Sequence, residues 1–118
     1  MNDETNQAQS IDLVGFCHTY ISHPEVATTI KDPCMVVAAD PENPNAILRL
    51  GLAFHKIHAW NAMMFVLSPL AQTPSPYQIP ALALLAHSQI EVGNDARNRV
   101  YEAELARCFS NTPDAFNN

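Results

Sequence analysis

Two stretches of the sequence decide the fold: AILRLGLAFHKIHAWNAMMFVLSPLAQT at residues 46–73 and ALALLAHSQIEVGNDARNRVYEAELARC at residues 81–108. A shift of 35 residues, from Ala46 to Ala81, brings similar residues together along both stretches. The matched pairs are Ala46/Ala81, Ile47/Leu82, Leu50/Leu85, Gly51/Ala86, Ile57/Val92, His58/Gly93, Phe65/Val100, Leu70/Leu105 and Ala71/Ala106. Their spacing by three, four and seven residues is typical of one face of an α-helix. Small and large residues alternate among them, so each stretch predicts two closely packed helices.

The length of the repeat predicts the architecture. Because a helix–turn–helix unit of about 34 residues is the tetratricopeptide repeat, we expect an all-α, tetratricopeptide-like helical-repeat solenoid of about three antiparallel helix pairs. A third, weaker copy follows from a shift of 36 residues, which places Ile47 on Ile11. Small helical repeats bury their apolar faces only against neighbours, and about three are needed for stability. We therefore expect one helical-repeat domain at residues 10–111, between flexible tails at 1–9 and 112–118.

Prolines and polar residues divide the chain into elements. We expect a first helix that is capped by Ser10 and ended by Pro24, because the residue before proline avoids the α conformation. Residues 25–39 allow either two short helices divided at Pro33 or a strand at 34–39, where β-branched residues cluster. A lone strand would have no partner in this chain, which favours the helices. Four further helices are expected at 44–58, 60–72, 77–92 and 94–109.

Local signals refine these helices. Asn43 is expected to cap the helix at 44–58, with Pro44 in its first position, and Gly93 to end the helix at 77–92. Pro69 should kink or shorten the helix at 60–72, because it lacks the N–H that the helix needs. The expected core residues are Ile11, Val14, Cys17, His18 and Ile21; Ile47, Leu50, Phe54 and Ile57; Trp60, Met63, Met64, Phe65 and Leu67; and Ala96, Val100, Ala103, Leu105 and Ala106. The alternative for the methionine-rich third group is a binding surface.

The composition excludes several classes of partner. The 118 residues include 6 Lys and Arg against 12 Asp and Glu, which gives a net charge of −6. Proteins that bind nucleic acid or anionic membranes need clustered basic residues, so we expect neither kind of partner. The first nine residues are polar and no apolar run approaches the roughly 18 residues of a membrane span, so we expect a soluble cytoplasmic protein without membrane insertion.

Side chains that often carry chemistry do not form a recognisable site. Cys17, Cys34 and Cys108 are widely spaced, and we interpret them as small apolar residues rather than as reactive or paired thiols. His55 and His58 can share a helix face, but no acidic residue or cysteine completes a metal site at a recognisable spacing. The sequence also lacks a phosphate-binding loop and a nucleophile elbow. We expect a non-catalytic protein with no metal and no cofactor.

The repeat region resembles one family of small proteins. The stretches Ala46–Leu50 and Ser88–Arg97, with the turn from Gly93 to Ala96 leading into a helix that contains Leu105, resemble the needle-subunit chaperones of type III secretion systems (the YscG/PscG type). The resemblance implies a virulence-associated chaperone that binds the amphipathic helix of a needle subunit and prevents premature polymerisation. It also implies a small helical cochaperone, so the expected state is a hetero-oligomer of proteins.

The repeat register predicts which residues bind this partner. The first helices of stacked pairs line a concave groove, and an amphipathic helix binds such a groove through its apolar face. The groove-facing residues by this register are Leu48, Leu52, His55, Ala83, His87 and Ile90. Arg49, Lys56 and Glu91 are expected to form a polar rim, and the alternative for Leu48 and Leu52 is that they belong to the core. The alternative function is that of a generic tetratricopeptide-like adaptor, which binds another peptide or scaffolds a complex.

Overall fold

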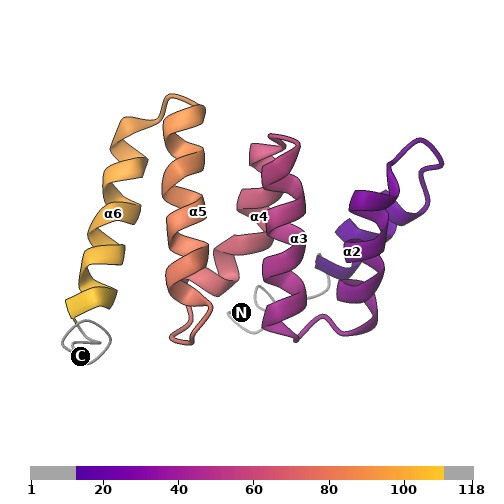
Figure 1. Ribbon diagram of the computed structural model, residues 1–118, viewed down its shortest axis with the longest axis horizontal. Coiled ribbons are helices and arrows are strands. Elements are labelled where there is room, and N and C mark those ends of the chain that lie inside the picture. Colours follow the sequence, from indigo (N-terminus) through magenta and orange to yellow (C-terminus); the bar gives the residue numbers. More distant parts are fainter. Residues whose placement is uncertain (1–12, 111–118) are drawn as a thin grey trace, which may run out of the picture. The chain divides into compact units, whose positions relative to one another are not determined.

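The computed structural model describes residues 13–110, and every regular element in this range is a helix. A first helix covers residues 13–21. The others, labelled in Figure 1, are α2 (Thr28–Ala39), α3 (Pro44–Lys56), α4 (Trp60–Ala71), α5 (Gln78–Glu91) and α6 (Asp95–Ser110). The prediction of an all-α protein is confirmed over this range. Ser10, Ile11 and both expected tails lie outside the described residues.

The chain divides into two compact units within α4. Unit 1 ends at Val66 and unit 2 begins at Leu67. In unit 1, α2 and α3 lie side by side and run in opposite directions, joined by a short loop (Figure 1). In unit 2, α5 and α6 form a second antiparallel pair. The single domain expected over residues 10–111 stays a prediction.

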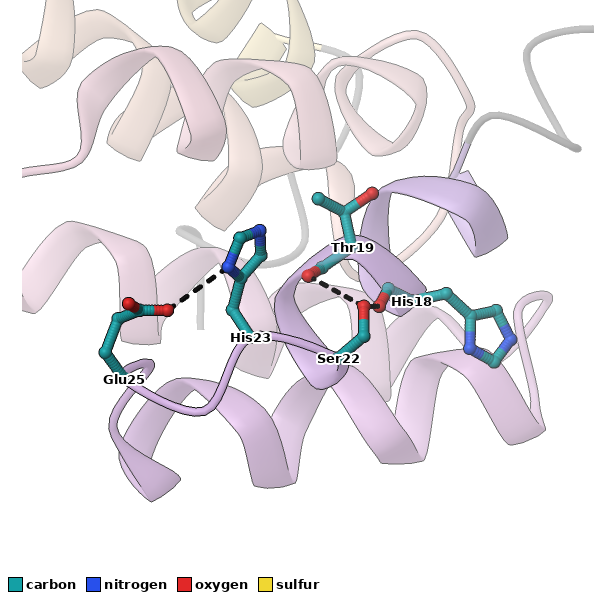
Figure 2. Close-up of polar contacts among 5 residues, drawn as sticks. All are labelled: His18, Thr19, Ser22, His23 and Glu25. Atoms are coloured by element: carbon teal, nitrogen blue, oxygen red, sulfur yellow. Dashed lines mark hydrogen bonds and ion pairs between the residues drawn. The ribbon is translucent and has the colours of Figure 1, made fainter.

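The first helix ends before Pro24, as expected. Residue 21 is its last, and the hydroxyl of Ser22 folds back to donate to the carbonyl oxygen of His18 at 2.7 Å (Figure 2). Next along the chain, Nδ1 of His23 lies 3.2 Å from a carboxylate oxygen of Glu25. Of the predicted core residues in this helix, Cys17 is fully buried, but His18 is exposed.

An aromatic cluster holds the first helix in unit 1. The ring of Phe16 lies 5.8 Å from that of Phe54 in α3 and 4.8 Å from that of Phe65 in α4. Tyr20, one turn later, lies 5.2 Å from Phe54. Tilted and edge-on ring pairs of this kind are each worth about 1 kcal/mol beyond the area that they bury. Phe54, which touches two rings of the first helix, is fully buried.

Helix α2 corrects the prediction for residues 25–39. It runs without a break from Thr28 to Ala39, with Pro33 inside it, so there are neither two short helices nor a strand. Pro33 cannot donate to the carbonyl oxygen of Thr29, which weakens the helix at this point. Buried residues at Ile30, Cys34 and Val37 compensate, because they form one continuous apolar face across the proline.

Helix α3 begins as predicted. The side chain of Asn43 accepts hydrogen bonds from the backbone N–H groups of Asn45 and Ala46, at 3.0 and 3.4 Å, and Pro44 occupies the first helical position. The helix ends at Lys56, two residues earlier than expected. Ile57 therefore lies beyond the last turn and is 56% exposed, so its prediction as a core residue was wrong.

The ends of α3 and α5 have the same geometry, 35 residues apart. His58 and Gly93 follow the two helices with φ angles of +60° and +79°. The backbone N–H of Ala59 donates to the carbonyl oxygen of Phe54 at 3.0 Å, and that of Asn94 donates to Gln89 at 2.8 Å. Gly93 adopts this left-handed conformation without cost, whereas a residue with a Cβ loses about 1–2 kcal/mol there.

The buried faces of α3 and α5 also correspond. Each buried residue of α3 has a buried counterpart in α5: Ala46/Ala81, Ile47/Leu82, Leu50/Leu85, Gly51/Ala86 and Phe54/Gln89. The last pair differs in chemistry, because α5 places an amide where α3 has an aromatic ring. The Gln89 Nε2 donates to the hydroxyl of Ser88 at 3.2 Å, and that hydroxyl donates to the carbonyl oxygen of Leu85 at 2.6 Å.

Helix α6 packs differently from the prediction. None of its residues is fully buried, and Ala96, Val100, Ala103 and Ala106 are all exposed. The half-buried side chains are instead Asn98, Tyr101, Glu104, Leu105 and Cys108, so of the predicted core residues only Leu105 faces inward. Asn98 fixes this orientation, because its Nδ2 donates to the carbonyl oxygen of Ala86 in α5 at 2.7 Å.

Helix α4 continues through Pro69 and ends at Ala71, one residue before the expected end at residue 72. It therefore does not end at the proline, and the alternative of a kink stays a prediction. The five apolar residues predicted as its core differ in burial. Met63 and Leu67 are fully buried, Trp60 and Met64 are half-buried, and Phe65 is 43% exposed.

Candidate protein-binding groove

A groove runs between α2 and α3 in unit 1. Its volume is about 1050 Å³, against about 340 and 580 Å³ for two clefts in unit 2. The residues that line it are Thr29, Asp32, Pro33 and Val36 from α2, Asn43 from the loop, Asn45, Ala46, Leu48, Arg49, Leu52, Ala53 and Lys56 from α3, and Ile57. A groove of this volume is large enough for several side chains of a partner.

The helical spacing of α3 explains how one helix serves both core and groove. Its buried face consists of residues 46, 47, 50, 51 and 54, whereas residues 45, 48, 49, 52, 53 and 56 line the groove, and Ala46 at the boundary belongs to both. Three large apolar groove residues are well exposed: Val36 at 54%, Leu52 at 40% and Ile57 at 56%. Exposed apolar residues that gather in one concavity, rather than singly, mark an interaction surface.

Three charged side chains border this apolar surface. Asp32 lies on the α2 wall, and Arg49 and Lys56 lie on the α3 wall. Within residues 13–110, neither Arg49 nor Lys56 takes part in an ion pair. The Arg49 Nε donates to the side-chain oxygen of Asn45 at 3.4 Å, which orients the guanidinium along the helix.

The predicted partner-binding residues fall into three places. Leu48 and Leu52 both line the groove, with Leu48 half-buried. His55 is half-buried elsewhere on α3, where its ring lies 5.5 Å from that of Trp60 in an edge-on arrangement. Ala83, His87 and Ile90 are exposed on one face of α5, in unit 2. They are spaced by four and three residues, and Ile90 is 54% exposed.

The expected polar rim is divided in the same way. Arg49 and Lys56 belong to the groove of unit 1. Glu91 lies on α5, where one of its carboxylate oxygens is 3.4 Å from Nε2 of His87. This contact becomes an ion pair when the imidazole is protonated.

The α2 wall of the groove was missed from sequence. Thr29, Asp32, Pro33 and Val36 follow the spacing of one helix face, but that spacing is visible only if the helix continues through Pro33. Reading the proline as a break divided this face between two elements. The two adjacent valines suggested a strand at 34–39, but in the helix they face different ways. Val37 is buried, while Val36 lies in the groove.

Two of the three cysteines meet in the interior of unit 1. Cys17 and Cys34 are fully buried and reduced, and a hydrogen bond joins their thiols. This hydrogen bond, together with burial, raises the pKa of Cys34 far above its ordinary value. A thiol that stays protonated is a poor nucleophile. Cys108 in α6 is half-buried.

The described part of the chain offers no cluster of three or more His, Cys, Asp or Glu side chains that could hold a metal ion. The two histidines considered as ligands both contact Trp60, because the His58 ring stacks on it at 5.1 Å and His55 meets it edge-on. Among residues 13–110, none of the helices has the length and apolar character required to cross a membrane.

Comparison with known proteins adds nothing to this geometry. No family model, no curated protein and no solved structure matches the chain. The groove must therefore be interpreted from its own residues.

Proposed function

We propose that the protein is a non-catalytic chaperone whose groove binds the apolar face of an amphipathic helix. The observation that supports this function is the apolar groove along α3, in which Val36, Leu52 and Ile57 are exposed together. Helix α3 has 13 residues, and at 1.5 Å per residue it spans about 20 Å. A partner helix of about four turns has the length to lie along it.

The tetratricopeptide-like solenoid of about three antiparallel helix pairs is part of the same proposal. Its support is local: α3 and α5 end at Lys56 and Glu91, and α4 and α6 begin at Trp60 and Asp95, each 35 residues apart. The shared burial pattern and helix-end geometry of α3 and α5 point the same way.

For the client we propose the helix of a type III secretion needle subunit, on the resemblance of the repeat region to needle-subunit chaperones. Covering an apolar helix face keeps a self-assembling subunit from polymerising before export. Leu48 and Leu52 are the proposed contacts in unit 1, whereas His55, Ala83, His87 and Ile90 stay predictions. The proposal includes a small helical cochaperone and a cytoplasmic hetero-oligomer.

The test is purification of the full-length protein from its native cell, followed by mass spectrometry of what accompanies it. We expect an equimolar complex with a helical protein shorter than this chain. A chain that purifies as a lone, stable monomer would overturn the chaperone, and one bound to a large assembly would favour the adaptor instead.

Two matched variants locate the binding surface. Leu52→Asp places a charge on the apolar groove and should weaken partner binding more than tenfold, because the carboxylate loses its hydration when the partner binds. Met35→Asp places the same charge on α2 outside the groove, at a residue that is 54% exposed. It should bind normally. Circular dichroism checks that both variants keep the helical content of the wild type, and equal binding by both would place the partner elsewhere.

A further inference from the structure

The charges around the groove are distributed in a way that the overall composition hides. The chain has a net charge of −6. Residues 13–66 nevertheless contain three basic residues, Lys31, Arg49 and Lys56, and two of them line the α3 wall of the groove. The opposite wall contributes one acidic residue, Asp32. One side of the groove is therefore positive and the other negative.

From this arrangement we infer that the groove takes an amphipathic helix of a partner protein with two carboxylates on the flank that faces α3. The inference rests on the proposed function and names the chemistry of the partner. Because Asp32 repels carboxylates on the α2 side, it also sets which flank of the partner faces which wall. The apolar surface supplies affinity, and the charged walls supply orientation.

The spacing of the basic residues specifies the spacing of the carboxylates. Arg49 and Lys56 are seven residues apart, which is two helical turns or about 10.5 Å along α3. They share a face with Leu52, so all three side chains meet the same partner surface. A partner helix lying along α3 therefore needs Asp or Glu residues about seven positions apart, beside its apolar stripe.

The geometry of Arg49 favours a carboxylate over other acceptors. Its Nε donates to Asn45, which leaves the two terminal nitrogens of the guanidinium to bind both oxygens of one carboxylate. Lys56, in the last turn of α3, has a flexible ammonium group that accepts a wider range of partner positions. We therefore assign the more stringent contact to Arg49.

The test uses three synthetic peptides about 18 residues long, enough to form a helix when bound. All carry the same leucine stripe at helical spacing, and they differ only at two flanking positions seven residues apart, which hold Glu, Gln or Lys. Binding to the full-length protein is measured by fluorescence anisotropy, at low salt and again at about 1 M NaCl, where charges are screened beyond about 3 Å.

The expected order of affinity is Glu, then Gln, then Lys, with the Glu peptide binding about fivefold more tightly than the Gln peptide at low salt. High salt should reduce this ratio toward one. The double variant Arg49→Gln, Lys56→Gln should abolish the preference and retain binding of the Gln peptide. The matched control is Arg97→Gln, Arg99→Gln, which changes the net charge equally at exposed residues of α6 and should leave the preference intact.

The outcomes separate the two proposals. Equal binding of the three peptides, or a preference that the α6 control also removes, would overturn the acidic-flank inference and leave a helix-binding groove. Failure of every peptide to bind would overturn the groove function and the inference together. Self-association of the chain that the groove variant Leu52→Asp removes would mean that a second copy occupies the groove, which also overturns the inference.

Discussion

Helices α3 and α5 present the same inner face and different outer faces. Every buried residue of α3 has a buried counterpart in α5, and both helices end in a left-handed residue with the same hydrogen bonds. On the outside, α3 has Leu48, Arg49, Leu52 and Lys56 along a groove, whereas α5 has the exposed residues Ala83, His87, Ile90 and Glu91. The duplicated inner pattern is what the fold requires. The divergent outer pattern is where a specific function can reside.

The largest effect on stability is expected in the buried faces that α3 and α5 have in common. Leu50 and Leu85 are equivalent and both fully buried. Replacing either with alanine should lower the free energy of unfolding by about 2–5 kcal/mol, since each change leaves a cavity. Urea denaturation measures both. A cost below about 1 kcal/mol at one of the two sites would mean that the equivalent positions are not packed equivalently.

The next effect concerns the two left-handed residues. Gly93→Ala should cost about 1 kcal/mol, because a Cβ is unfavourable at a φ of +79°. At His58, the glycine variant should be more stable than the alanine variant by a similar amount, since both lose the stacking on Trp60 but only glycine relieves the backbone. Thermal unfolding of the three variants checks this. An alanine at 58 as stable as glycine would contradict the equivalence of the two turns.

The N-terminal cap of α3 has no counterpart in α5, and this difference can be tested. Asn43 caps α3 through its side chain, whereas Tyr77 at the start of α5 makes no such bond. Asn43→Ala should therefore cost about 1 kcal/mol of unfolding free energy, and Asn43→Asp should retain most of the stability because its carboxylate still accepts. Tyr77→Ala is the control, because no cap hydrogen bond is lost at that position. An equal loss of unfolding free energy for Asn43→Asp and Asn43→Ala would refute the cap.

The smallest expected effect on stability is at the groove. Replacing Arg49 and Lys56 with glutamine should change the free energy of unfolding by less than about 0.5 kcal/mol, because both side chains extend from the outer face of α3 and form no ion pair within residues 13–110. Urea denaturation compares this variant with Leu50→Ala. A large loss would assign the two residues to the fold rather than to binding.

The regular inner faces explain which parts were predictable. Asn43 followed by Pro44, the glycine at 93 and the spacing of Leu50 and Phe54 each act within one or two helical turns, so local patterns suffice to place α3 and the end of α5. Leu48 and Leu52 in the groove follow from the same register.

The errors occurred where the environment outweighs local preference. Pro33 stays inside α2 because Ile30, Cys34 and Val37 bury a continuous face, a tertiary effect that no local rule includes. In α6 every turn contains small apolar residues, so the periodicity did not identify the packed face. The bond from Asn98 to Ala86 does, and it lies across two helices. Because a break was expected at Pro33, the α2 wall of the groove was not predicted.

The buried contact between Cys17 and Cys34 allows local opening of unit 1 to be measured by thiol labelling. A thiol reagent cannot reach either sulfur while the first helix is packed on α2, since both are fully buried. Their labelling rates therefore measure how often that helix separates from the rest of unit 1, a local event that bulk denaturation averages away. The labelling rate of the half-buried Cys108, in unit 2, is an internal reference for both of these rates. Slower labelling of the buried pair in the presence of a partner would reveal, without any added probe, that binding in the groove tightens the helices behind it.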